Sequence, residues 1–201
     1  MRSNSGSIHM KLPVPLAFLM FLSSAMWALA ATRFGTDLRG QPVHDLAIPG
    51  TRAVVLFFAA SDCPLSNRYV PEIARLTQEF GPRGVRVWWV YPNPGDTAEV
   101  VDKHNRAYAI SGDSILDTNQ SLVKLAHATA TPEAAVFVVE GKTLREVYQG
   151  RVDDRYISLG QERPQAQHHD LELAITAALA GKPVPHPQGP PVGCSIVFLP
   201  K

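Results

Sequence analysis

Cys63 stands where a cysteine can be made reactive by its surroundings. It follows the apolar run Ala53–Ala60 by three residues and precedes a segment of helical spacing, Ser66–Phe80. Amide groups at the start of a helix favour a thiolate, and the nearby Arg68 acts in the same direction. Asp62 opposes them, because a neighbouring carboxylate disfavours a second negative charge. The position at the carboxyl end of a buried strand predicts a functional thiol.

Cys194 is the second thiol, and it follows a segment of unusual composition. Residues 181–193 contain five prolines, which favour an extended polyproline-like chain. At about 3.1 Å per residue the segment spans at most roughly 40 Å, whereas a domain of this size has a radius of gyration of about 15 Å. Cys194 can therefore reach Cys63. A reversible redox pair, a static disulfide and two thiols that never meet all stay open.

Composition excludes several classes of protein. The chain has 201 residues, 19 Lys+Arg against 18 Asp+Glu, and 45% hydrophobic residues. A formal net charge of +1 argues against a nucleic-acid binder. The apolar fraction excludes a wholly disordered chain. Two cysteines cannot form a four-thiolate zinc site, but they can form one disulfide.

The N-terminal segment has the pattern of a targeting sequence. Residues 12–31 contain no charged side chain, follow Arg2 and Lys11, and include the small-x-small pattern Ala28–Ala30. This pattern predicts either a cleaved signal peptide or a retained membrane anchor over residues 1–30. Both predict export to the periplasm or the extracellular space, with a domain over 31–180 and a proline-rich tail over 181–201. Export places the cysteines where disulfides persist.

Alternating strands and helices predict an α/β fold. A continuous apolar run predicts a strand buried on both faces, whereas apolar residues at helical spacing predict an amphipathic helix. The expected strands are 53–60, 85–91, 135–139 and 144–149, the last two forming a hairpin. The expected helices are 66–80, 97–108, 117–128 and 165–180. The apolar tip 193–199 is expected to dock on its own domain, with docking on a partner as the alternative.

Three features together resemble the thioredoxin-like superfamily over about residues 34–180. Cys63 precedes a helix, Pro71 lies eight residues further on, and Thr131-Pro132 stands just before a core strand. The long interval between Cys63 and Pro132 leaves room for an added strand and helix. That spacing is similar to the redoxin branch, which includes the alkyl hydroperoxide reductase/thiol-specific antioxidant proteins. The segment 150–156 and the Gly193-Cys194 tail are similar to an exported subgroup of it.

The resemblance implies a central mixed sheet flanked by helices and an exported thiol–disulfide oxidoreductase. Cys63 would be the attacking thiolate, Pro132 a cis-proline facing it, and Cys194 the resolving or disulfide partner. Pro64, Ser66, Thr131 and Arg68 would contact the substrate. That substrate is a protein or small-molecule disulfide, thiol or peroxide, and no organic cofactor is implied.

The chain departs from the family pattern at informative positions. Ser66 replaces the second cysteine of thioredoxins, so local resolution of a mixed disulfide is impossible. The threonine of peroxiredoxins is Ala60 here, with Ser61 next to it. Their arginine has no match, with Arg145 and Arg151 as stand-ins. Peroxide reduction is therefore the weaker prediction.

Two alternatives accompany the redox prediction. Cys63, Cys194 and His127 could bind copper or another soft metal ion. The protein could also be a non-catalytic binding module that a Cys63–Cys194 disulfide stabilises. A further expectation concerns Asp153 and Asp154, whose simplest role is in salt bridges with Arg151 and Arg155.

Overall fold

The computed structural model describes Met1 and residues 34–199. The predicted signal peptide or anchor of residues 1–30, and the possible membrane tether of residues 12–31, lie outside the described residues. Among the helices within residues 34–199, none has both the length and the apolar character needed to cross a membrane.

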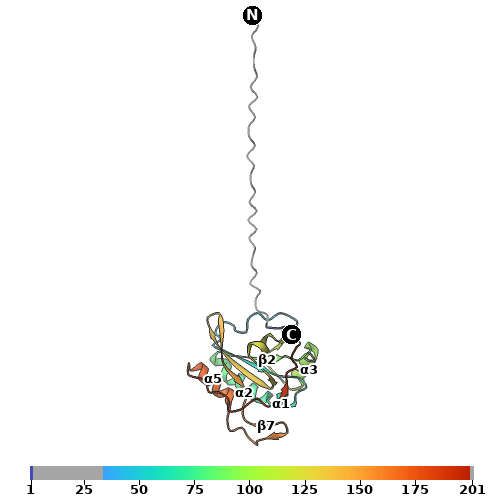
Figure 1. Cartoon of the computed structure of the whole chain (residues 1–201), viewed down its shortest axis with the longest axis vertical. Helices are drawn as coiled ribbons and strands as arrows, with labels where there is room; N and C mark the ends of the chain where they lie inside the picture. Colours follow the sequence, from blue (N-terminus) through green and yellow to red (C-terminus); the bar gives the residue numbers. More distant parts are fainter. Residues whose placement is uncertain (2–33, 200–201) are drawn as a thin grey trace. The chain divides into compact units, whose positions relative to one another are not determined.

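A five-stranded mixed sheet forms the centre of the domain (Figure 1). Its strand order is β3-β2-β1-β5-β6, in which β1, β2 and β3 are parallel, β5 runs antiparallel to them and β6 runs antiparallel to β5. The strands are β1 (Ala53–Phe58), β2 (Val85–Tyr91), β3 (Asp113–Leu116), β5 (Glu133–Glu140) and β6 (Thr143–Gly150). The predicted mixed sheet and its terminal hairpin are confirmed.

Short elements and helices complete the fold. The helices are α1 (Pro64–Arg68), α2 (Val70–Phe80), α3 (Ala98–Ala107), α4 (Ser121–Leu125) and α5 (Asp170–Leu179), with a 3-10 turn η1 (Gly81–Arg83). The minor strands are β4 (Ala130–Thr131), β7 (Tyr156–Ser158), β8 (Gln161–Glu162) and β9 (Cys194–Ser195).

Both faces of β1 are buried, which explains its uninterrupted apolar sequence. Phe57 and its neighbours on one face pack with Ile73 of α2 and Leu171 of α5. Leu56 and the residues on the other face pack with Leu122 of α4. The adjacent Trp88 and Trp89 of β2 are likewise buried in opposite clusters. Helices therefore cover both faces of the sheet, as predicted.

The expected helix over 66–80 is two helices. The chain breaks at Tyr69, and Pro71 occupies the second position of α2. Proline has no N–H to donate into a preceding turn, and it fits the first turn of a new helix. Pro71 thus lies in the first turn of a second helix.

Two other helices are shorter than predicted because aspartates bind the backbone around them. Asp117 accepts hydrogen bonds from the N–H groups of Leu122 and Val123, so α4 begins at Ser121 rather than at 117.

Residues 113–116 form β3, a strand that the periodicity did not predict.

The start of the last helix is set by Asp154. Its carboxylate accepts from the N–H groups of Gln167 and His168, at 2.6 and 3.0 Å, which keeps these residues outside α5. Asp153 accepts from the Tyr69 hydroxyl and from a backbone N–H. The expected salt bridges of this acidic pair with Arg151 and Arg155 are therefore wrong: Arg151 pairs with Asp170, and Arg155 lies 3.9 Å from Glu162.

Glu133, at the start of β5, holds the loop that leads into it. The side chain is buried, and Oε2 accepts hydrogen bonds from the N–H groups of Thr129 and Ala130, at 2.7 and 3.0 Å. Gln149 of β6 donates to the other carboxylate oxygen. A buried carboxylate satisfied in this way fixes residues 129–131 relative to the sheet.

Glu133→Gln is expected to destabilise the domain by about 1–3 kcal/mol, because the amide presents one acceptor and leaves a buried donor unsatisfied. Glu140→Gln, at the exposed end of the same strand, is expected to change the free energy of unfolding by less than about 0.5 kcal/mol. Urea denaturation of the three proteins measures both values. Equal stabilities for the two variants would contradict the assigned role of Glu133.

Candidate functional site

Cys63 lies in the turn between β1 and α1, where hydrogen bonds of the turn fix its position. Its N–H donates to the carbonyl of Ala60 at 3.1 Å, and it is the residue directly before α1. The preceding Ser61 donates both its N–H and its hydroxyl to the buried carboxylate of Asp96. Burial raises the pKa of Asp96, whereas the two hydrogen bonds from Ser61 act against this rise. The turn is therefore tied to the loop that follows β2.

A second buried polar network holds α1 itself. Asn67 Oδ1 lies 2.6 Å from His104 Nε2, and His104 Nδ1 lies 3.1 Å from the Tyr91 hydroxyl. Burial lowers the pKa of His104, so this ring is a neutral bridge between α3 and α1. The chain thus fixes both the turn before Cys63 and the helix after it.

The Thr131-Pro132 peptide bond is cis, as the resemblance implied. The Thr131 carbonyl oxygen lies 3.1 Å from Cys63 Sγ, where a protonated thiol donates to it. The loop held by Glu133 therefore faces the thiol directly.

The C-terminal tail brings Cys194 to the same place. Strand β9 pairs antiparallel with β4, with Thr131 opposite Cys194 and Ala130 opposite Ser195. Cys194 Sγ lies 2.8 Å from Cys63 Sγ, and both cysteines are free thiols. The structure thus juxtaposes the two sulfurs that the sequence left unpaired.

Gly193 makes this pairing possible. A Cβ atom at this position would lie 2.2 Å from the carbonyl oxygen of Thr131 and 2.9 Å from the ring of Pro132. No side chain fits there, so glycine directly before Cys194 is a steric requirement of the docked tail.

Five contacts hold the tail beyond Cys194. Ile196 is 3% exposed and packs in the cluster that contains Leu56 and α4. Its N–H donates to the Thr129 carbonyl at 3.1 Å. Asn93 accepts from the N–H of Val197 at 3.0 Å. The side-chain amide of Gln120 donates to the Val197 carbonyl at 2.7 Å and accepts from the N–H of Leu199 at 2.9 Å.

The electrostatics of the two thiols are opposite. Burial raises the pKa of Cys63, but hydrogen bonds from Cys194 and from Ser66 lower it, and the net pKa lies below the ordinary value of a cysteine. Burial raises the pKa of Cys194 to about 12, and the charge of a Cys63 thiolate contributes to that rise. Cys63 is therefore the more acidic thiol of the pair, and Cys194 is the donor in the hydrogen bond between the two sulfurs.

Accessibility also separates the two thiols. Cys63 is completely buried, whereas Cys194 is partly exposed. An external molecule can therefore reach Cys63 only after residues around it have moved.

The other predicted substrate-contacting residues divide into two groups. Pro64 is the first residue of α1, and Ser66 lies against Cys63 and accepts from the N–H of Ala60 at 3.4 Å. Arg68, at the far end of α1, forms an ion pair with Glu162 at 3.2 Å. Pro64 and Ser66 are thus placed beside the thiol, and Arg68 is placed toward a separate cavity.

The stand-ins for the peroxiredoxin donors have other partners. Arg145 forms an ion pair with Glu140, and Arg151 forms one with Asp170. Ser61 is held by Asp96. Among residues 34–199, none of these three side chains forms a hydrogen bond with either sulfur.

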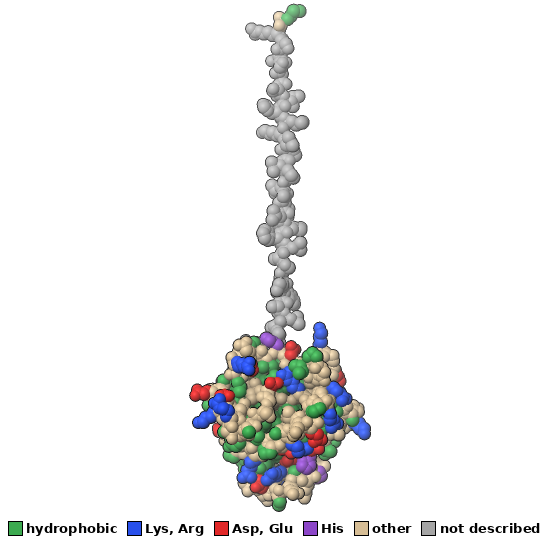
Figure 2. Space-filling model, turned by 180° about the vertical axis from the view of Figure 1, so that it is seen from behind, with side chains coloured by type: hydrophobic (Ala, Val, Ile, Leu, Met, Phe, Trp, Pro, Cys, Tyr) green, Lys and Arg blue, Asp and Glu red, His purple; other side chains and the backbone are tan. Residues whose placement is uncertain are grey.

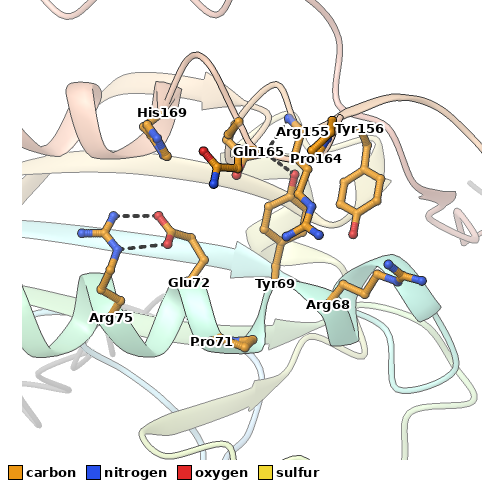
Figure 3. Close-up of a pocket in the computed structure, with 12 residues that line it drawn as sticks. Arg68, Tyr69, Pro71, Glu72, Arg75, Arg155, Tyr156, Pro164, Gln165 and His169 are labelled. Carbon is orange, nitrogen blue, oxygen red and sulfur yellow. Dashed lines mark hydrogen bonds and ion pairs between the residues drawn. The ribbon is translucent and has the colours of Figure 1, made fainter. Parts of the chain in front are cut away.

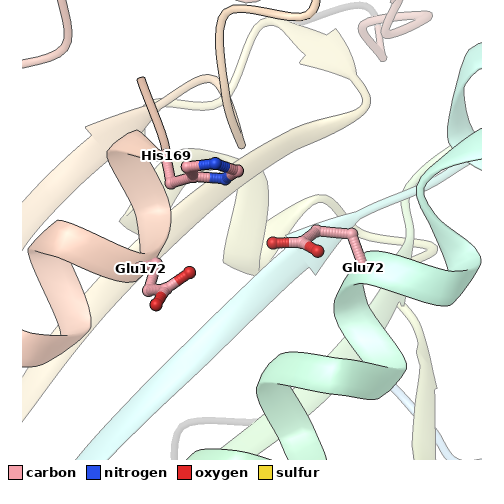
Figure 4. A group of neighbouring side chains, drawn as sticks. All are labelled: Glu72, His169 and Glu172. Carbon is pink, nitrogen blue, oxygen red and sulfur yellow. The ribbon is translucent and has the colours of Figure 1, made fainter. Parts of the chain in front are cut away.

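Metal-ligating side chains meet elsewhere. His127 lies on the exposed turn after α4. Within the described part of the chain, the one group of three ligand side chains is Glu72, His169 and Glu172, with ligand atoms within 4.8 Å of one another (Figure 4). Arg75 already forms ion pairs with both glutamates, which leaves little charge for a cation. This group contains neither cysteine.

Two residues that hold the site in place were not predicted from the sequence. Glu133 stands where peroxiredoxins have their arginine, and only its partners show that it holds the Thr131 loop. Gln120 has a left-handed backbone (φ 54°) and contacts the tail across more than seventy residues of sequence. The short strand β3 before it was the missing signal, because it places residue 120 at the carboxyl end of the sheet.

Comparisons with known proteins agree with this geometry. The AhpC/TSA family profile matches residues 29–147. An uncharacterized conserved protein from Geobacillus kaustophilus is 28% identical, with a TM-score of 0.67 over 85% of this chain and 91% of that one. A hypothetical protein from Sinorhizobium meliloti is 26% identical, with a TM-score of 0.67 over 83% and 91%. No curated protein is significantly similar to the chain in sequence.

The family profile covers more than half of the chain, and the cysteine, the cis-proline and the mixed sheet occupy the positions that the thioredoxin-like resemblance implied. The chain therefore belongs to the AhpC/TSA family of thioredoxin-like redoxins.

Proposed function

We propose that the protein is an exported thiol–disulfide oxidoreductase whose redox pair is Cys63 and Cys194. The observation that carries the proposal is the 2.8 Å separation of the two sulfurs together with their opposite pKa shifts. A thiolate beside a thiol within contact distance is the reduced form of a disulfide couple. Ser66 replaces the usual second cysteine, and the tail supplies the missing thiol from the other end of the chain.

The chemistry follows from the two pKa directions. With the tail displaced, the Cys63 thiolate attacks one sulfur of a substrate disulfide, and the other substrate sulfur leaves as a thiolate. Cys194 then loses its proton and attacks Cys63 Sγ, which expels the second substrate thiolate and forms the Cys63–Cys194 disulfide. The substrate disulfide is reduced to two thiols, and a dithiol reductant returns the pair to its starting state.

Movement of the tail is part of this proposal because Cys63 is fully buried beneath it. The tail is attached by a two-residue ladder, the buried side chain of Ile196, one further backbone hydrogen bond and four side-chain-to-backbone hydrogen bonds. Proline-rich residues 183–191 precede it without helix or strand. Local opening of such a segment costs far less than unfolding of the sheet.

Peroxide reduction is the weaker function for this site. It requires donors that polarise the peroxide oxygen beside the thiolate. Arg145, Arg151 and Ser61 are engaged with carboxylates elsewhere. Export is supported by the apolar stretch over residues 12–31 and by a cysteine pair that suits an oxidising compartment.

Cys194→Ser is expected to trap the first intermediate. An aromatic disulfide reagent such as DTNB should leave a lasting mixed disulfide on Cys63 of this variant, because serine cannot expel the reagent thiol. The wild type should release two equivalents of reagent thiol and close its own disulfide. Intact mass spectrometry counts the adducts, with Cys63→Ser as the control that lacks the attacking thiol. A wild type that retains the adduct as long as Cys194→Ser does would refute resolution by Cys194.

Cys194→Ala is expected to raise the pKa of Cys63, because the variant loses the thiol that donates to the thiolate. In the wild type, Cys63 should ionise below the pH at which an ordinary cysteine does. In the variant, the midpoint should move to higher pH. Ultraviolet absorbance of the thiolate against pH measures both, and Ser195→Ala on the exposed neighbour should leave the midpoint unchanged. An unchanged midpoint in Cys194→Ala would contradict the assigned hydrogen bond.

Ile196→Ala is expected to expose Cys63 more often, since truncating a buried isoleucine removes about 2–5 kcal/mol of packing. In a Cys194→Ser background, alkylation of Cys63 by iodoacetamide should accelerate at least about tenfold, a shift that needs only about 1.4 kcal/mol of that loss. Phe198→Ala in the same tail is the matched control, because Phe198 is 59% exposed. Equal alkylation rates for the two variants would show that the tail does not cover Cys63 in solution.

A further inference from the structure

A cavity of about 470 Å³ lies beside the junction of α1 and α2, apart from the two thiols (Figure 3). One wall comes from the end of α1 and the start of α2, and the other comes from the segment 153–169. Its residues are Arg68, Tyr69, Pro71, Glu72, Arg75, Asp153, Arg155, Tyr156, Pro164, Gln165, Ala166 and His169.

Two buried donors in this wall have no acceptor. Tyr156 is 6% exposed, and its hydroxyl has no hydrogen-bond partner among the described residues. The Arg68 guanidinium acts to lower the pKa of this hydroxyl, but a guanidinium is itself a donor and cannot accept the hydroxyl proton. Arg155 Nε is also buried and unpaired, with a carboxylate oxygen of Glu162 at 3.9 Å. Buried donors are normally satisfied, so two that line one cavity without an acceptor point to a missing one.

Most charged groups around the cavity already have partners. Arg75 forms ion pairs with Glu72, Glu79 and Glu172 on the far side of the cavity, near His169. The Asp153 carboxylate accepts hydrogen bonds from the Tyr69 hydroxyl at 2.5 Å and from the backbone N–H of Arg155 at 2.9 Å.

Arg68 and Arg155 remain, and they share a single carboxylate. Glu162 lies 3.2 Å from Arg68 and 3.9 Å from Arg155. Glu162 is thus shared between two guanidinium groups and leaves Arg155 Nε without a hydrogen bond.

We propose that this cavity binds a small organic carboxylate, with its oxygens held by Arg68, Arg155 and the Tyr156 hydroxyl. Arginine pairs with carboxylates through two parallel hydrogen bonds, and a tyrosine hydroxyl adds a third donor. The rings of Pro71 and Pro164 and the methyl group of Ala166 offer an apolar wall for the body of the ligand. The proposal is independent of the redox function, because no sulfur lines the cavity.

Benzoate is the first probe, benzamide its neutral counterpart and phenyl phosphate the doubly charged one. We expect benzoate to shift the amide NMR signals of residues 153–169 of the full chain and to bind more tightly than either of the others. Tyr156→Phe keeps the ring that packs on Tyr69 but removes the donor. It should weaken benzoate roughly tenfold, the loss expected for one hydrogen bond to a charged group, while leaving the melting temperature of the free protein unchanged or higher.

Two further variants keep the test decisive if Tyr156→Phe fails to fold. Arg68→Gln should weaken benzoate, whereas Glu162→Gln should strengthen it by removing the competing carboxylate. Arg106→Gln is the matched control, because Arg106 is an exposed arginine that pairs with Asp102 on α3. Equal affinity for benzoate and benzamide, benzoate shifts outside the cavity, or equal affinities of the Arg68→Gln and Arg106→Gln variants would each overturn the proposal. Tighter binding of phenyl phosphate than of benzoate would also overturn the proposal, because it would show that the cavity prefers a phosphate to a carboxylate.

Discussion

The site depends on one short backbone pairing, the antiparallel contact between β4 and β9. It joins residues 130–131 to residues 194–195 and thereby sets Cys194 Sγ 2.8 Å from Cys63 Sγ. The pairing exists because Gly193 leaves room for the Thr131 carbonyl. Two ladder positions contribute little by themselves, so the surrounding contacts must hold the strand in place.

The rest of the fold supplies those contacts from the carboxyl ends of the parallel strands. Asn93 follows β2 and Gln120 follows β3, and both bind the backbone of the tail. Glu133 fixes the opposing loop from within β5. One face of the domain carries acidic, basic and hydrophobic side chains interspersed with one another (Figure 2). That mixture agrees with the near-neutral charge of the chain.

Sequence patterns predicted the parts of this protein that local rules control. The apolar run of β1 and the hairpin of β5 and β6 follow from burial and turn chemistry. The resemblance carried by Cys63 and the Thr131-Pro132 pair gave the fold. Helix limits at Asp117 and Asp154 were missed because each carboxylate binds backbone groups that periodicity assigns to a helix. The contacts of Glu133 with Gln149, of Gln120 with the tail and of Tyr156 with Tyr69 join residues far apart in the sequence, which no local pattern contains.

The central claim is that Cys63 and Cys194 form a reversible redox couple rather than a structural bond. Equilibration of the full chain in glutathione buffers of defined potential, followed by acid quenching and mass spectrometry of the linked peptides, measures the reduction potential directly. A functional couple predicts a Cys63–Cys194 disulfide with a potential near or above about −230 mV. A potential below about −300 mV would identify a structural disulfide, and the absence of any linked peptide under oxidising conditions would contradict the pairing itself.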